Sequence, residues 1–456
     1  MALDLILRNG NVFYNRQLNN MSIGIKDGKI SDIGHISENS VKVIDVSNKI
    51  VIPGGIDPHT HIEGYSKVGT IETGSMAAAM GGTTSILDFS QANKKEDTLE
   101  AARSKIQRFK DKSYLDFTIK PMMVTPDFES GEKLESIFNG LKKLDIIAVK
   151  IFTTYKNLGR YANNYQLYMG MKIAKKYNIM VQVHAENNDI LEGNLEQFAK
   201  GNKSSPIYHA MSKPNVSEDL AVADTSIIAG DTGEKSYLVH LSTKNSPIII
   251  NEARSHGIDI YGETCPQYLL LNEDFLKREN GNEYLCSPPL RKIEDNDAMW
   301  NALNMGYIKA VGSDHVPFLK EQKTKDLPFY NVPNGVPGIE TRLPLLFSEG
   351  VQKGKISLET FVNVISTNPA KIFGLYPNKG IINIGSDADI TVIDPKLDHS
   401  LKAEDLHMGS DISLYGHLIC HGWPILTISN GEIIMQDGVF TGEKHHGKFL
   451  KGKKYE

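Results

Sequence analysis

The chain contains few cysteines, little excess charge and no long apolar run. Its three cysteines among 456 residues are too few and too scattered for a disulfide framework, which favours a reducing compartment. The formal net charge of −5 gives no reason to expect nucleic acid or an anionic membrane as a partner. No apolar stretch is long enough to span a bilayer, and the first residues do not resemble a signal peptide. We therefore expect a cytoplasmic protein.

The two ends of the chain share a pattern that the middle lacks. Hydrophobic residues make up 40% of the chain and charged residues 23%, which is typical of a soluble globular protein. Near both ends, short alternating runs are separated by Asp-Gly and Asn-Gly pairs, which favour tight hairpins. We predict that residues 1–52 and 378–456, the latter including a C-terminal tail, form one β-sandwich, and that residues 53–377 form a second domain inserted between them.

The inserted segment alternates short apolar runs with longer amphipathic stretches. The eight strand candidates are 51–61, 85–89, 117–120, 146–152, 180–184, 237–240, 258–263 and 308–314. Alternation of strands and helices predicts a parallel sheet, and eight units indicate a closed (β/α)8 TIM-like barrel of the α/β class. An open doubly wound sheet is the alternative, but no Gly-x-Gly-x-x-Gly follows the first strand.

Polar residues lie where several of these runs end. His59 and His61 share one face of the first strand, because side chains two apart along a strand point the same way. The full set is His59, His61, Lys150, His184, His240 and Asp314. In a barrel the carboxyl ends of the strands meet at one mouth, where catalytic residues lie. Any one of these residues could be an ordinary polar side chain or helix cap, but together they predict a divalent-metal site.

Eight short motifs follow one another along the chain. They are Gly54–His61, Val149–Phe152, His184–Asn187, Glu263–Tyr268, Ser287–Arg291, Gly312–His315, Pro333–Gly338 and Asn368–Leu375. In these motifs, and over nearly the whole chain, the sequence resembles the dihydropyrimidinase/hydantoinase family of the amidohydrolase superfamily. The resemblance implies a two-metal barrel flanked by a β-sandwich. It also implies a homotetramer or a homodimer.

The resemblance further implies which residues hold the metals. The implied ligands are His59, His61 and Asp314 for the first metal, His184 and His240 for the second, and Lys150 as a bridge. Lys150 would react with carbon dioxide to give N6-carboxylysine, a carbamate that offers one oxygen to each metal. Imidazole and carboxylate ligands favour Zn²⁺, although manganese or cobalt would also fit.

The implied reaction is metal-dependent hydrolysis of the cyclic amide bond in dihydropyrimidines or 5-substituted hydantoins, which yields N-carbamoyl amino acids. A metal-bridging hydroxide would attack the ring, and Asp314 would pass its proton to the leaving nitrogen. Tyr155 would stabilise the oxyanion, and the backbone of Ser287 and Asn334 would bind the amide groups of the ring. We therefore expect an enzyme, a cyclic amidohydrolase acting on a small cyclic ureide.

Other functions share parts of this pattern. An allantoinase or a dihydroorotase-like cyclic amidase would use the same metal ligands, although the motifs at 287–291 and 334–338 favour the hydantoinase branch. A non-catalytic scaffold related to dihydropyrimidinases is a different class, and the intact ligand set argues against it. The remaining histidines, including His209, lack a strand-end position, and we expect them on the surface, in loops or in the tail.

Two loops bear on the ring substituent. The loop after the first strand contains Glu63, Tyr65 and Lys67, and the loop after Lys150 contains Lys156 and Arg160. The first loop is also short, which leaves the mouth of the barrel open. If these polar side chains face the substrate, small, polar or anionic substituents are favoured over bulky apolar ones. Alternatively, the cationic side chains point into water.

Overall fold

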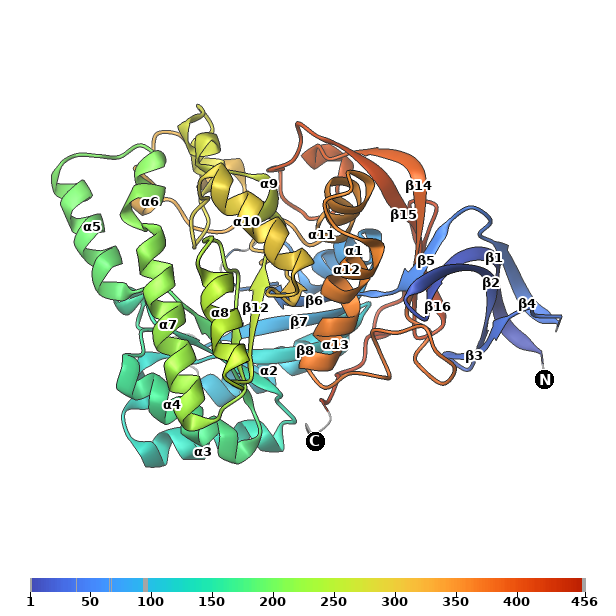
Figure 1. Cartoon of the computed structure of the whole chain (residues 1–456), viewed down its shortest axis with the longest axis horizontal. Helices are drawn as coiled ribbons and strands as arrows, with labels where there is room; N and C mark the ends of the chain where they lie inside the picture. Colours follow the sequence, from blue (N-terminus) through green and yellow to red (C-terminus); the bar gives the residue numbers. More distant parts are fainter. Residues whose placement is uncertain (1, 38, 65, 67, 93–96, 453–456) are drawn as a thin grey trace.

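A computed structural model describes residues 2–37, 39–64, 66, 68–92 and 97–452 of the chain. Two β-sheets organise these residues, and Figure 1 shows the helix-covered barrel beside the sheet built from both chain ends. Among the described residues, no helix combines the length and the apolar character that crossing a membrane requires.

The inserted segment folds as an eight-stranded parallel barrel. Its strands are β6 (Gly55–Thr60), β7 (Thr83–Gln91), β8 (Asp116–Met122), β9 (Ala148–Phe152), β10 (Met180–His184), β11 (Ser236–Leu238), β12 (Ile260–Thr264) and β13 (Ala310–Val311). Neighbours in sequence are neighbours in the sheet, from β6 to β13. Two backbone hydrogen bonds of 3.0 Å close the barrel, from Asp314 to His59 and from His61 to His315. The predicted fold class is confirmed.

Helices cover the outside of the barrel (Figure 1). They are α1 (Ile71–Met80), α2 (Thr98–Lys112), α3 (Gly131–Lys143), α4 (Asn164–Tyr177), α5 (Asn188–Lys200), α6 (Ile207–Ser212), α7 (Asn215–Thr232), α8 (Ser246–Ser255), α9 (Pro266–Leu270), α10 (Ile293–Asn304), α11 (Arg342–Leu345), α12 (Leu358–Val362) and α13 (Asn368–Ile372). Side-chain caps fix where several begin. The Asn163 side chain accepts from the Gln166 amide at the start of α4, and Asn187 caps α5 in the same way. Because α5 starts so soon after His184, it lies at the mouth of the barrel.

Both ends of the chain form one nine-stranded sheet. Its strands are β1 (Leu3–Tyr14), β2 (Gln17–Lys26), β3 (Lys29–Gly34), β4 (Ser40–Asp45), β5 (Ile50–Pro53), β14 (Ile390–Ser400), β15 (Ile419–Ser429), β16 (Glu432–Gln436) and β17 (Val439–Phe440). Antiparallel pairing of β5 with β14 joins the two ends, with Val51 opposite Val392. The predicted union of the termini is confirmed, while the boundaries after residues 52 and 377 stay predictions.

A buried lysine connects the barrel to this sheet. The ammonium group of Lys379 lies 2.7 Å from Asp116 of β8, 3.1 Å from Asp387 and 2.6 Å from Asp389. Burial opposes the charge of Lys379, but the three carboxylates outweigh it and raise its pKa. The cluster therefore holds β8 against the segment that leads into β14.

Candidate metal centre and cavity

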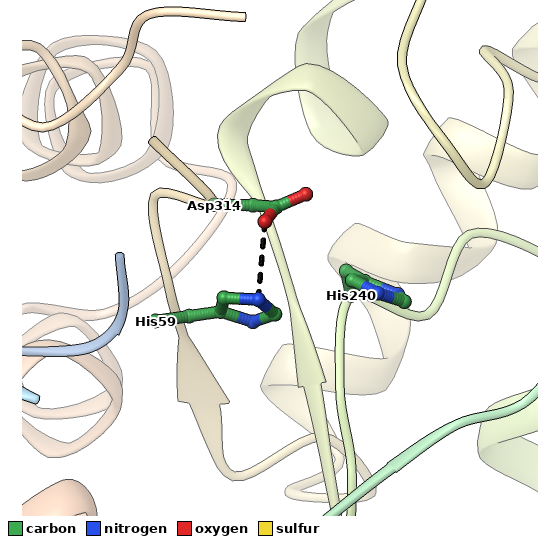
Figure 2. A group of neighbouring side chains, drawn as sticks. All are labelled: His59, His240 and Asp314. Carbon is green, nitrogen blue, oxygen red and sulfur yellow. Dashed lines mark ion pairs between the residues drawn. The ribbon is translucent and has the colours of Figure 1, made fainter. Parts of the chain in front are cut away.

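The barrel brings the six predicted metal ligands to its mouth. His59 lies on β6, Lys150 on β9 and His184 at the end of β10, whereas His61, His240 and Asp314 follow β6, β11 and β13. All six side chains are buried. Figure 2 shows three of them, with the ion pair between His59 and Asp314 dashed. The convergence predicted from the strand ends is therefore present in the fold.

One ring nitrogen lies at the centre of this group. The Nε2 atom of His59 lies 3.0 Å from Oδ1 of Asp314, 3.3 Å from Nε2 of His61 and 3.1 Å from Nζ of Lys150. Ligand atoms of His59, His240 and Asp314 all lie within 4.8 Å of one another. Nδ1 of His240 is buried and has no hydrogen-bond partner among the described residues. Converging imidazole and carboxylate atoms with an unsatisfied buried nitrogen fit a bound divalent cation.

Two carboxylates orient histidines of the group. Glu263 accepts a hydrogen bond of 2.6 Å from Nδ1 of His59, and it also accepts bonds from the Tyr237 hydroxyl and the His240 amide. Glu186 accepts a bond of 2.7 Å from Nε2 of His184. A histidine that donates through one nitrogen keeps a lone pair on the other, so His59 and His184 each have a ring nitrogen free to bind a metal.

Burial keeps the group in protonation states suited to metal binding. It lowers the pKa of His61 and His240 well below the usual value, and lowers that of His184 to about 4. Burial also lowers the pKa of Lys150 to about 8. It would raise the pKa of Asp314, but His59 outweighs it and the pKa lies well below its usual range. Neutral imidazoles beside a carboxylate are the forms that bind metal.

Three of the predicted functional residues have left-handed backbone. The φ angle is 40° at His240, 49° at Asp314 and 65° at Tyr155. Residues other than glycine rarely adopt such backbone angles, and each residue held there costs about 1–3 kcal/mol of stability. The packed surroundings must hold these residues, which is common where side chains are aimed at a reaction site.

A cavity of 770 Å³ contains the exposed edge of the group. Five of the predicted ligands line it, together with Tyr155, Ser287 and Asn334, the predicted substrate contacts. Much of the remaining wall is apolar. It includes Phe152, Leu158, Leu191, Leu195, Val316, Phe318, Phe329 and Val332. The structure therefore brings the predicted substrate contacts and metal ligands into one space.

The polar loops contribute less to this wall than predicted. Glu63 instead forms ion pairs with Arg108 at 3.3 Å and with Lys112 at 4.0 Å. Tyr65 and Lys67 lie outside the described residues, and Lys156 is exposed and is not among the described residues that line the cavity. Arg160 is buried and does line it. The described part of the first loop therefore does not line the cavity, whereas Thr154, Asn157 and Arg160 of the second loop do.

Sequence reasoning missed three residues close to the site. His209 was expected on the surface, in a loop or in the tail, but it is buried, lines the cavity and donates to the Cys286 carbonyl at 2.7 Å. Lys213 also lines the cavity and donates to the Ser287 hydroxyl at 2.8 Å. Glu186 belongs to a motif quoted for the family but had no predicted role. The contacts of His209 and Lys213 join segments far apart in sequence, so strand periodicity could not indicate them. Glu186 lies only two residues from the His184 that it contacts.

Comparisons with known proteins agree with this architecture. The Amidohydrolase family matches residues 50–434. The chain is 36% identical to a D-hydantoinase of Geobacillus stearothermophilus, over 99% of this chain and 97% of that protein. It is also 36% identical to a D-hydantoinase of Ralstonia pickettii over the full length of both chains. A dihydropyrimidinase structure from Brevibacillus agri superposes with a TM-score of 0.92, at 36% identity over 99% of each chain.

The barrel and its mouth of imidazole and carboxylate groups define a metal-dependent hydrolase of the amidohydrolase superfamily. Within that superfamily, the chain belongs to the hydantoinase family.

Proposed function

We propose that this chain is a cyclic amidohydrolase that opens the ring of dihydropyrimidines or 5-substituted hydantoins and releases N-carbamoyl amino acids. The observation that carries the proposal is the single cavity shared by the metal-ligand group and the three candidate substrate contacts. The similar proteins named D-hydantoinase and dihydropyrimidinase support the same class of reaction.

The proposed centre holds two divalent metals, with Zn²⁺ favoured. The proposed ligands are His59, His61 and Asp314 for one metal, His184 and His240 for the other, and carboxylated Lys150 between them. When bound, the metals would supply a water activated for attack near neutral pH. The neutral amine of Lys150 adds to carbon dioxide and releases a proton, which converts a cation into the carboxylate that two metals require.

The side chains around the ring have separate proposed roles. Asp314 takes a proton from the attacking water and delivers it to the ring nitrogen as the amide bond breaks. The Tyr155 hydroxyl donates to the oxygen that gains negative charge during attack. The backbone of Ser287 and Asn334 binds the alternating N–H and C=O groups of the ureide. Together they hold one ring amide beside the metals.

A same-chemistry alternative is an allantoinase or dihydroorotase-like activity, because those reactions need the same metal ligands. A non-catalytic scaffold is disfavoured, since all six ligand residues are present and buried. We further propose a cytoplasmic homotetramer or homodimer. Exposed apolar side chains on one helix, Val216, Leu220 and Ile227 of α7, favour association with another copy. Light scattering would give the mass in solution, and a monomer would contradict the proposal.

A substrate panel with metal analysis tests the function. The purified protein is assayed for release of N-carbamoyl products from dihydrouracil, hydantoin, 5-substituted hydantoins, allantoin and dihydroorotate. We expect turnover of dihydrouracil or a hydantoin and about two metals per chain. If only allantoin or only dihydroorotate is hydrolysed, the protein is an allantoinase or a dihydroorotase-like enzyme instead. Asp314→Asn serves as the inactive control, and turnover by this variant at the wild-type rate would contradict the proposed proton transfer.

A further inference from the structure

Lys213 occupies a constrained position beside the cavity. It lies in the short link between α6 and α7 and precedes Pro214, which restricts its backbone. The Arg291 guanidinium donates to the Lys213 carbonyl and to the Ser242 hydroxyl, and it lies 3.4 Å from Glu218 of α7. These contacts fix the main chain from which the lysine side chain extends.

The ammonium group of Lys213 lies among three residues of the proposed site. It donates a hydrogen bond of 2.8 Å to the Ser287 hydroxyl and lies 3.6 Å from Oε2 of Glu186. It also lies 5.5 Å from the centre of the Tyr155 ring, within the range of a cation–π contact. The side chain is only 12% exposed. Lys213 therefore touches the substrate-contact side and the metal side of the cavity together.

Glu186 gives this cation a defined task. Its side chain is fully buried, and the oxygen nearest Lys213 is the one that accepts from His184. Its other oxygen has no hydrogen-bond partner among the described residues. Without the lysine, a buried carboxylate beside a metal ligand would lose a balancing charge.

We propose that Lys213 is a positioning residue, which ties the loop at Ser287 to the Glu186 carboxylate that orients His184. It sets the distance between the bound ring and the metals without contacting the reacting atoms. The inference rests on the proposed function, because it assigns Ser287 to the substrate and His184 to a metal. Lys213 lies outside the eight sequence motifs that the chain shares with the family.

Three substitutions separate this role from simple packing. Lys213→Met keeps the length of the side chain and removes its charge. Lys213→Arg restores a cation that can reach both partners. Lys203→Met is the matched control. Lys203 lies between α5 and α6 and also packs on aromatic rings, those of Phe198 and Tyr208, but it is exposed and is not among the described residues that line the cavity.

We expect Lys213→Met to lower kcat/KM by about 10- to 100-fold, with a higher KM, and to lose metal to a chelator faster than wild type. Lys213→Arg should recover most of both properties, and Lys203→Met should match wild type. A double-mutant cycle with Ser287→Ala should be non-additive in KM, because both changes remove the same hydrogen bond.

Several results would overturn the inference. Wild-type KM and metal retention in Lys213→Met would do so, as would additive effects in the cycle or an arginine variant as impaired as the methionine variant. The two proposals fail differently. A wild type that holds metal but opens no ring refutes the proposed reaction, and the metal-loss comparison then still decides whether Lys213 acts on the centre. A wild type that binds no metal refutes both.

Discussion

Lys150 determines how the proposed metal centre would respond to pH. It is almost fully buried, and its ammonium nitrogen lies 3.1 Å from Nε2 of His59. Burial lowers its pKa to about 8, so that at pH 8 about half of the amine is neutral, against about 1% at pH 6. Only the neutral amine reacts with carbon dioxide, and formation of the bridge should therefore decrease as the pH falls.

The pH dependence of metal loading tests whether formation of the bridge decreases as the pH falls. Metal-free protein is incubated with Zn²⁺ and bicarbonate at pH 6 and at pH 8, and bound metal is measured by elemental analysis after removal of excess ions. We expect lower occupancy at pH 6, because protonated Lys150 cannot form the carbamate. Equal loading at both values would show that the lysine nitrogen does not control assembly of the centre.

The loss of activity caused by replacing Lys150 should be partly rescued by added carboxylic acids. Lys150→Ala removes the proposed bridge, so the variant should lose metal and activity, and short carboxylic acids should restore part of both by supplying the missing carboxylate. Turnover and metal content are measured with and without the acid. Full activity in a metal-free preparation of wild type or variant would contradict a metal-dependent reaction.

Tyr155 should be separable from the metal ligands. Its ring lies 5.1 Å from that of His184, but its proposed task is hydrogen bonding to the substrate. Tyr155→Phe should therefore keep both metals and lose roughly 10²–10³ in kcat, the usual cost of one oxyanion donor. Near-normal turnover with intact metal content would make Tyr155 a structural loop residue.

At the scale of elements, the Lys379 cluster that joins β8 to the segment before β14 gives a stability prediction. Lys379→Met would leave Asp116, Asp387 and Asp389 near one another without their buried counter-charge. We expect a loss of about 3–5 kcal/mol in the free energy of unfolding. Urea denaturation followed by circular dichroism measures this loss.

Lys29→Met is the matched control for this change. Lys29 pairs with the same Asp387 at 2.5 Å, but its side chain is 48% exposed, and exposed pairs contribute at most about 1 kcal/mol. If both variants lose the same small amount, burial does not distinguish the two lysines, and the connecting role of Lys379 is wrong.

The elements were predictable from sequence because local patterns specify them. The period of two in the predicted strand 51–61 put His59 and His61 on one side, and their Nε2 atoms lie 3.3 Å apart. The cap at Asn163 likewise begins α4. The left-handed backbone of His240 and Asp314 was not predictable, since tertiary packing rather than local preference holds it. The same limit explains why Lys213 was missed, because its partners become neighbours only after the barrel closes.

At the scale of the whole molecule, closure of the barrel and placement of α5 over its mouth define the space for a ring substituent. The loops alone predicted small polar substituents, but much of the cavity wall consists of Phe, Leu and Val side chains. Each CH₂ group buried against such a wall contributes about 0.8 kcal/mol. The assembled fold therefore favours apolar substituents over the polar ones that the isolated loop sequences indicated.

This reversal leads to a prediction for Leu195, an α5 side chain in the cavity wall. Wild type should have a higher kcat/KM for 5-benzylhydantoin than for unsubstituted hydantoin. Leu195→Asn should lower the former about 10-fold and leave the latter within about twofold. We expect the substituent rather than the ring to pack against α5, so that about 1.4 kcal/mol of apolar contact would be lost. Leu397→Asn, at an exposed site on β14, is the control and should change neither value. Two results together would contradict this prediction: a clear preference for polar-substituted hydantoins and no effect of Leu195→Asn. They would support the preference predicted from the loops and would leave the proposed metal chemistry unaffected.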